Sequence, residues 1–321
     1  MAKRKVIIDT DAGVDDTQAL VVCLTSPSVD VIGISCVGGN TSVGNVAHNV
    51  CRTLAVLKRE DVPVFVGSDL PLMMSAAGTE GPQRAPEWHG DDGLGDAAFD
   101  WEPSMAPVVG GEHAANAIVR LVKESPGEVT LLALGPHTNV AIALNLDPGL
   151  ADTVAAFMFM GGTYHAKGNK TAAAEFNIAA DVEAAAICSA RFPQATMVTC
   201  TYVCITPSVV SSPCHASGEL TLDFALDFGF VEVIDKSKTF GGTLAIPDVL
   251  AAAVICDPSV VLESKKRHVA VETAGRLTRG MTVVNWDNIP APGWEVPVPN
   301  TDIVMKLDVA KLRDMLKAST H

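Results

Sequence analysis

The residues best suited to chemistry lie near the start of the chain. Four carboxylates fall within eight residues, directly after the apolar run 5–8 and at the start of a helical pattern: Asp9, Asp11, Asp15 and Asp16. One or two aspartates at such a position commonly cap the helix. Four would repel one another at neutral pH unless a cation or several donors compensated their charge. Clustered carboxylate oxygens suit Ca²⁺ or Mg²⁺ better than zinc, so this segment predicts a metal site.

Further polar clusters follow other apolar runs. Gly161 and Gly162 lead into a segment whose amides and carboxylate suit sugar hydroxyls better than phosphates: Asn169, Glu175 and Asn177. Paired glycines allow a ligand to approach the backbone closely, although Asn and Gly are also ordinary turn residues. Asn40 follows a second glycine pair, and Leu134 ends an apolar run that precedes Gly135. Asp248 directly follows Pro247, which suits a helix N-terminus.

The elements that must position these residues alternate along the chain. Short β-branched runs at 5–8, 29–36, 62–66, 129–134, 154–160, 196–200 and 303–307 predict strands. Ala-rich stretches at 15–24, 43–57, 112–123, 138–146, 182–190 and 249–255 predict helices. The strands are apolar on both faces, which is typical of a parallel sheet covered by helices. We therefore predict an α/β fold with an open, mostly parallel central sheet, helices on both faces, and the active site at the carboxyl ends of the strands.

Two regions interrupt this alternation. Residues 70–107 are rich in Gly, Pro, Asp and Met and predict a long surface loop, a common form of binding loop or lid. Residues 207–242 predict a helical insertion. Neither resembles an interdomain linker, so we expect one domain over residues 1–321.

Composition excludes several classes of protein. The chain has 23 basic and 37 acidic residues, and a net charge of −14 argues against nucleic acid or an anionic membrane as a partner. No apolar stretch reaches the roughly 18 residues of a membrane span, and no secretory signal is recognisable. The eight cysteines mostly lie in apolar runs and predict reduced, buried thiols. We expect a cytoplasmic protein.

The motifs together resemble the inosine-uridine preferring nucleoside hydrolase family. The resemblance runs in order from about Val6 to about Ile255, and its specificity comes from the order and spacing of the motifs. They are Asp9-Thr10-Asp11-x-Gly-x-Asp15-Asp16, Gly39-Asn40, Gly135-Pro136-x-Thr138-Asn139, Met160-Gly161-Gly162, Gly168-Asn169, Glu175-Phe176-Asn177 and Asp248.

The resemblance implies a Ca²⁺-dependent N-ribohydrolase that converts a nucleoside and water into a free base and ribose. Calcium would be held by the residues matching Asp11, Asp16, Asp248 and the backbone carbonyl of Leu134, and Asp11 would also take the proton of the attacking water. The residues matching the family's ribose ligands are Asp15, Asn40, Asn169, Glu175, Asn177 and Asp248. Carboxylates around the sugar would stabilise the positive charge that develops as the glycosidic bond breaks.

Two departures from the family pattern bear on this expectation. Ala12 replaces the usual proline of the first motif, a change in loop rigidity that we expect to be tolerated. Pro247 replaces the histidine that broad-specificity members carry beside the calcium-binding aspartate, and proline cannot protonate a leaving base. His89 is then the best substitute acid, and Trp88 a candidate for stacking on a purine; the alternatives are an exposed loop histidine and a tryptophan that anchors its loop.

The function predicted from the sequence is thus calcium-dependent nucleoside hydrolysis, with a slight preference for purine nucleosides and a place in nucleoside catabolism or purine salvage. The expected partners are a small-molecule nucleoside and further copies of the chain, in a dimer or a tetramer. Two alternatives stay open. One is a non-catalytic nucleoside- or ribose-binding protein, and the other is a Mg²⁺-dependent aspartyl-phosphate phosphatase, whose further Lys and acidic pair cannot be placed here.

Overall fold

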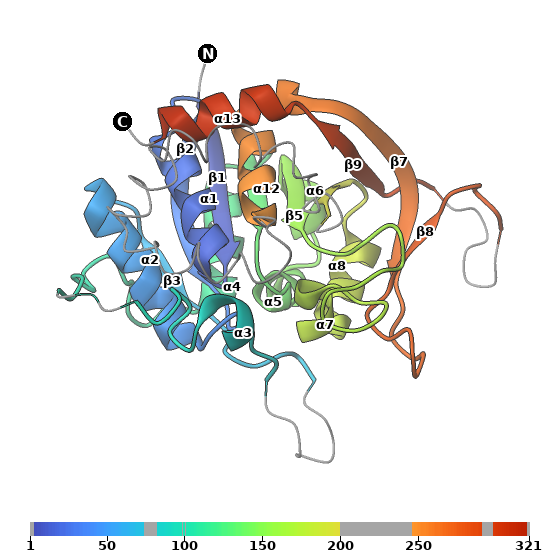
Figure 1. Cartoon of the computed structure of the whole chain (residues 1–321), viewed down its shortest axis with the longest axis horizontal. Helices are drawn as coiled ribbons and strands as arrows, with labels where there is room; N and C mark the ends of the chain where they lie inside the picture. The colour runs from blue at the N-terminus through green and yellow to red at the C-terminus, as the bar shows by residue number, and fades with distance from the viewer. Residues whose placement is uncertain are drawn as a thin grey trace, which may run out of the picture.

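The fold is built around one mixed sheet with helices on both sides (Figure 1). The computed structural model describes residues 3–73, 82–97, 99, 101–199, 246–290 and 298–319. Within them, nine strands form the sheet in the order β3-β2-β1-β4-β5-β6-β9-β7-β8. Their bounds are β1 Arg4–Thr10, β2 Val29–Cys36, β3 Val64–Val66, β4 Val129–Ala133, β5 Ala156–Met160, β6 Ala195–Val198, β7 Val261–Val271, β8 Thr282–Asn285 and β9 Thr301–Leu307.

The sheet is parallel from β3 to β9, and β7 runs antiparallel to both of its neighbours. Successive residues of β1 show how both faces are buried. Val6 and Ile8 pack on one face, and Ile7 packs on the other. Because no side of the strand meets water, the sequence is apolar at every one of these positions.

Two groups of helices cover the two faces. Helices α1 (Val14–Thr25), α2 (Val43–Leu57), α12 (Pro247–Cys256) and α13 (Val309–Ala318) contribute to the hydrophobic cluster on the Val6 face. Helices α4 (Ala114–Glu124), α5 (Thr138–Leu146) and α8 (Val182–Arg191) contribute to the cluster on the Ile7 face. The short elements are α3 (Pro86–His89), α6 (Leu150–Thr153), α7 (Phe176–Ala180) and the 3₁₀ turn Pro258–Val260.

The strand order creates a topological switch point beside β1. The chain moves outward from β1 through β2 to β3, and then returns to the other side of β1 to form β4. At such a switch point the connections after the two central strands diverge, which leaves a crevice outside their carboxyl ends. The aspartate-rich segment follows β1 and Leu134 follows β4, so the topology confirms the predicted placement of the polar loops.

The predicted elements agree with the structure for the parallel strands and the long helices, and fail for the antiparallel part of the sheet. β7 was not predicted because its middle is charged and exposed instead of apolar: Glu263, Ser264, Lys265 and Lys266. The prediction of a wholly surface loop over residues 70–107 is wrong in part, since it contains α3 and the buried residues Gly93 and Leu94. The predicted insertion at 207–242 lies outside the described residues.

The structure also bears on two expectations from composition, the state of the cysteines and the absence of membrane spans. Five cysteines of the described ranges are free and buried, as predicted: Cys23, Cys36, Cys51, Cys188 and Cys256. Among the helices of these ranges, none combines the length and the apolar character that crossing a membrane requires.

A buried histidine lies in the core beside two phenylalanines. His137 precedes α5, and its ring meets those of Phe157 and Phe159 edge-on at centroid distances of 5.7 and 5.0 Å. Neither ring nitrogen has a hydrogen-bond partner within the described part of the chain. The adjoining cavity, of about 10 Å³, has room for about one water molecule and none for a nucleoside. Burial lowers the pKa of His137 from 6.5 to about 4, so the core holds a neutral imidazole.

This histidine makes the stability of the fold sensitive to acid. Because the pKa of His137 is lower in the folded than in the unfolded chain, its contribution is lost as the pH falls from 6.5 toward 4, by about 2 kcal/mol at pH 5. His137→Leu removes the titrating group. We therefore expect the difference in unfolding free energy between wild type and this variant to shift by that amount between pH 7.5 and pH 5, measured by denaturant titration. A pH-independent difference would contradict the assignment.

Candidate active site

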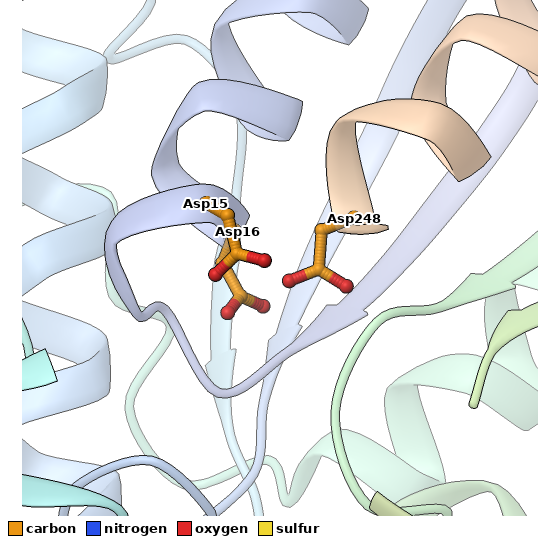
Figure 2. A group of neighbouring side chains, drawn as sticks. All are labelled: Asp15, Asp16 and Asp248. Carbon is orange, nitrogen blue, oxygen red and sulfur yellow. The ribbon is translucent and has the colours of Figure 1, made fainter. Parts of the chain in front are cut away.

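Three aspartates from the two ends of the chain meet at the switch point. Asp15 and Asp16 lie in the first turn of α1 and Asp248 lies in the first turn of α12, and their carboxylates point toward one another (Figure 2). One oxygen from each lies within 4.8 Å of the others, and all three side chains are buried. Both helix N-termini face this space and contribute positive potential to it. The structure thus brings Asp248 to the acidic segment, as the sequence predicted.

Asp16 is held by the loop that enters α1. Its Oδ1 accepts a hydrogen bond from the Thr10 hydroxyl at 2.6 Å, and its Oδ2 accepts one from the Gly13 backbone N–H at 3.0 Å. The side-chain amide of Asn40 donates to the same Oδ2 at 3.0 Å. These donors fix the carboxylate in one orientation and compensate part of its charge.

Asp11 lies in a close-packed setting between two backbone segments. Its Oδ2 accepts a hydrogen bond from the backbone N–H of Asn40 at 2.7 Å. A Cβ at Gly39 would collide with this carboxylate, and one at Gly135 would lie 3.0 Å from Asp11 Cγ. The backbone can approach Asp11 this closely only because both residues are glycine. Asn40 therefore contacts both Asp11 and Asp16, and in this structure it organises the acids.

The charges of the site are only partly compensated by protein donors. Burial and the charge of Asp16 raise the pKa of Asp11 well above its usual range, and raise that of Asp15 to about 7. Burial and the charges of Asp15, Asp16 and Asp11 likewise raise the pKa of Asp248. Asp11 Oδ1 and Asp248 Oδ1 are buried with no partner among the described residues. Unpartnered carboxylate oxygens that face a cluster of like charges are the donor set of a hard divalent cation, so these residues fit a metal ion.

The predicted sugar ligands of the second motif are largely engaged with the backbone. Glu175 caps α7: its Oε1 accepts from Asn177 N at 3.0 Å, and its Oε2 from Gly162 N at 2.9 Å and Ile178 N at 3.3 Å. Burial still raises the pKa of Glu175 to about 7. The Asn177 amide donates to the carbonyl of Leu134 at 2.6 Å and joins it to Met160. These two side chains therefore connect the loops that follow β4 and β5.

Asn169 lies at the surface of the loop that precedes α7. Its Oδ1 accepts a hydrogen bond from Phe176 N at 2.8 Å, so it fixes the approach to that helix. A Cβ at the preceding Gly168 would collide with Ala174, which explains the glycine in this motif. The structure places Asn169 farther toward solvent than the buried Glu175 and Asn177.

The loop that carries Trp88 and His89 packs against the start of α1. His89 Nδ1 accepts a hydrogen bond from the backbone N–H of Val14 at 3.1 Å, so a neutral ring carries its proton on Nε2. Burial lowers the pKa of His89 to about 4, although Asp16 and Glu87 oppose the shift. His89 is thus a docked, partly buried residue and not the exposed loop histidine that was the alternative. Trp88 is 38% exposed.

The same loop also contacts the segment around α7. Lys170 Nζ lies 3.7 Å from Glu87 and donates to the Arg84 carbonyl at 3.1 Å. Gln83 donates to the Ala179 carbonyl at 3.3 Å. The residues around α3 therefore join the start of α1 to the loops after β5.

The sequence did not predict a hydrogen-bond network that supports the strand ends next to the site. Asp9 Oδ1 accepts hydrogen bonds from the Ser35 hydroxyl and from the Asn139 amide, the latter at 2.9 Å. Asn139 also donates to the Cys36 carbonyl at 2.9 Å and accepts from Ser68 N at 2.9 Å. This network joins the ends of β1 and β2 to α5. Asp9 and Asn139 belong to the motifs of the sequence, but only their pairing across the sheet reveals this structural role.

The comparisons with known proteins agree with this architecture. A family model described as inosine-uridine preferring nucleoside hydrolase matches residues 6–314. The chain belongs to that family. The inosine-uridine preferring nucleoside hydrolase of Crithidia fasciculata is 31% identical over 315 residues, which cover 96% of this chain and 94% of that protein. The pyrimidine-specific ribonucleoside hydrolase RihA of Salmonella arizonae is 34% identical over 323 residues, with 97% and 96% covered.

Solved structures give the same result. An inosine-guanosine nucleoside hydrolase superposes with a TM-score of 0.86 at 29% identity and covers 99% of both chains. The purine-preferring ribonucleoside hydrolase from Gardnerella vaginalis superposes with a TM-score of 0.79 at 25% identity, covering 99% of this chain and 98% of that one. Together with the family match, these similarities show that the protein is an enzyme that acts on nucleosides and has the nucleoside hydrolase fold.

The first family motif has an unusual backbone in this nucleoside hydrolase. Ala12 has a φ of 38°, in the left-handed region that residues other than glycine and asparagine rarely adopt. Its N–H donates to the Thr10 hydroxyl at 3.0 Å. Proline, the usual family residue here, is fixed near φ −65° and has no N–H. Ala12 is therefore not a more flexible equivalent of proline, because a proline could neither adopt this φ nor make this hydrogen bond.

This conformation predicts opposite effects of two substitutions at one position. Ala12→Pro cannot adopt the φ and loses the hydrogen bond, so we expect it to destabilise the protein by about 2 kcal/mol or more. Ala12→Gly relieves the strained φ, and we expect it to be neutral or stabilising by up to about 1 kcal/mol. Denaturant unfolding of both variants measures these changes. A proline variant as stable as wild type would show that the loop does not require the positive φ.

Proposed function

We propose that this nucleoside hydrolase is a calcium-dependent N-ribohydrolase that releases the free base and ribose, with a preference for purine nucleosides. The observation that carries the proposal is the convergence of Asp15, Asp16 and Asp248 beside the unpartnered oxygens of Asp11 and Asp248. A site of four buried carboxylates is costly unless a cation shares it. The name of the family supplies the reaction class, and the oxygen-only donor set favours calcium.

The residues that would hold the cation are Asp11, Asp16, Asp248 and the carbonyl of Leu134. A bound calcium ion would lower the pKa of a coordinated water and position the sugar diol. Leu134 O already accepts from Asn177, but a carbonyl oxygen has a second lone pair. Asp15 is as close to the cluster as the other two aspartates, and we assign it to the boundary between cation and sugar.

Asp11 is the residue to which we assign the role of general base. Its Oδ2 is fixed by Asn40, and its buried Oδ1 is the atom left to accept a proton. Asn40, Asn169, Glu175, Asn177 and Asp248 are retained as ribose ligands of the proposal, with Asp15. Several polar contacts to one sugar would select ribose against analogues that lack a hydroxyl, since each missing hydroxyl leaves a buried group unpaired.

Because Pro247 replaces the usual histidine, another residue must stabilise the leaving base. His89 is neutral at pH 7 because burial lowers its pKa to about 4, and its Nδ1 is occupied by Val14. These properties favour a positioning role for His89. The exposed indole of Trp88 is the residue of this loop best suited to stack on a purine. Named relatives include both pyrimidine-specific and purine-preferring enzymes, so the purine preference rests on Trp88.

Further parts of the proposal come from the sequence. We infer one domain over residues 1–321, because β1 and β9 from opposite ends of the chain belong to the same sheet. The homo-oligomer, the cytoplasmic location and the role in nucleoside catabolism stay predictions.

The function is tested by measuring ribose release from a panel of purine and pyrimidine nucleosides, with and without calcium. We expect the wild type to be active on inosine and to lose activity after calcium is removed by chelation. Asp11→Asn keeps the shape of the side chain but cannot accept a proton, so it should lower kcat by about 10²–10⁴ or more. A variant within a few-fold of wild type would refute the assignment of the base.

Asp181→Asn is the matched control. Asp181 is also buried but caps α8 by accepting from Ala184 N at 3.0 Å, outside the acidic cluster. The substitution should lower the free energy of unfolding, while the protein that remains folded should keep the kcat of the wild type. Nucleoside binding without ribose release would indicate the non-catalytic alternative, and release of phosphate from a phosphate ester would indicate the phosphatase.

The role of the α3 loop is tested with two substrates that differ in the leaving group. Inosine needs stabilisation of its leaving base, whereas p-nitrophenyl riboside needs none. Trp88→Ala should lower kcat/KM for inosine about tenfold more than for the riboside, in line with the ~0.5–1.5 kcal/mol of an aromatic contact. His89→Ala should lower both about equally, because it loosens the loop. A selective loss on inosine for His89→Ala would instead identify His89 as the acid.

A further inference from the structure

Two thiols from opposite ends of the chain meet between α1 and α12. Cys23 lies in the last turns of α1 and Cys256 is the final residue of α12, and both are free thiols. The two helices pack side by side, as the blue and orange ribbons of Figure 1 show. Cys256 Sγ lies 3.8 Å from the carbonyl oxygen of Val22, the residue that precedes Cys23, and each thiol affects the pKa of the other. Their sulfur atoms are therefore neighbours in the folded protein.

The two thiols have unequal surroundings. Cys23 is completely buried, whereas Cys256 is 8% exposed at the end of its helix. The guanidinium of Arg4 donates to the carbonyl of Ile255, beside Cys256. The neighbouring Cys23 thiol, Ser26 and the charge of Arg4 lower the pKa of Cys256 against the effect of burial, while the Cys256 thiol and burial raise the pKa of Cys23. Cys256 is the more accessible of the two thiols and lies beside the positive charge of Arg4, so it is the better placed to attack first, and the fully buried Cys23 is placed to resolve.

The same two helices carry the acids of the proposed active site at their other ends. Asp15 and Asp16 lie in the first turn of α1, and Asp248 lies in the first turn of α12 (Figure 2). A covalent bond between Cys23 and Cys256 would fix the two helices to each other at the end away from the acids. Noncovalent packing alone sets that spacing while the thiols are reduced.

We propose that Cys23 and Cys256 are a redox-active dithiol that closes to an intramolecular disulfide by exchange with a low-molecular-weight disulfide. The Cys256 thiolate attacks one sulfur of the small disulfide, forms a mixed disulfide and expels one thiolate. The Cys23 thiolate then attacks Cys256 Sγ and expels the second. Two protein thiols are oxidised to one disulfide, one small disulfide is reduced to two thiols, and the two protons pass to the leaving thiolates.

The test is to incubate the native full-length protein with oxidised glutathione, block the remaining thiols by alkylation, and map disulfide-linked peptides by mass spectrometry. We expect a peptide that joins Cys23 to Cys256, formed without denaturant and reversed by dithiothreitol. Cross-linking residues so far apart in the chain restricts the unfolded state, so the oxidised protein should show a rise in Tm of about 5 °C or more. Neither readout depends on nucleoside hydrolysis.

Single-cysteine variants distinguish the roles of the two thiols. In Cys23→Ser, or Cys23→Ala if the serine variant does not fold, Cys256 should remain as a mixed disulfide with glutathione. In Cys256→Ser, Cys23 should remain unmodified. Cys188→Ser is the matched control, because Cys188 is buried on α8 on the other face of the sheet, and the Cys23–Cys256 link should still form. Absence of the linked peptide, or its appearance only in denaturant, would overturn the proposal.

Discussion

The compensation of buried negative charge is the constraint on which this structure depends. Asp11, Asp15, Asp16 and Asp248 are all buried close together, where every carboxylate raises the free energy of its neighbours. The protein supplies part of the compensation through Thr10, Gly13 and Asn40 around Asp16, and through the N-termini of α1 and α12. The oxygens left without partners on Asp11 and Asp248 mark where that compensation is incomplete. The folded site therefore has negative charge that its own donors do not compensate and that a bound cation would compensate.

The arrangement of the sheet makes such a concentration of charge possible. The carboxyl ends of the strands lie at the edge of the hydrophobic layers, so the acids are buried by loops and helix ends without interrupting the core. The helices α1 and α12 are packed along the Val6 face, which sets the distance between Asp15 and Asp248. Beneath the acids, Asp9, Ser35 and Asn139 join the strand ends by hydrogen bonds. The precision of the site therefore comes from contacts that are not themselves catalytic.

The loop around α3 lies beside the acidic cluster and connects it to the segment around α7. The acids and glycines form the family's motif, and the reaction class follows from that membership. The residues above them, Trp88 and His89, are held against α1 by the contact to Val14 and against α7 by Gln83 and Lys170.

The sequence alone determined the parallel strands, the long helices and the acidic motif, because each depends on residues that are neighbours in the chain or repeat with a regular period. The two-sided apolar runs predicted β2 with its correct bounds, and the spacing of the acids predicted their place after β1. Only the tertiary structure decided which groups meet. It showed that the oxygens of Glu175 are occupied by backbone donors, that Ala12 has a left-handed φ, and that His89 accepts from Val14. It also formed β7, whose charged sequence pairs with β9 at an exposed position, and it brought Cys256 to Cys23. These features depend on the direction of each side chain and on packing between distant segments, which no local pattern of residues encodes.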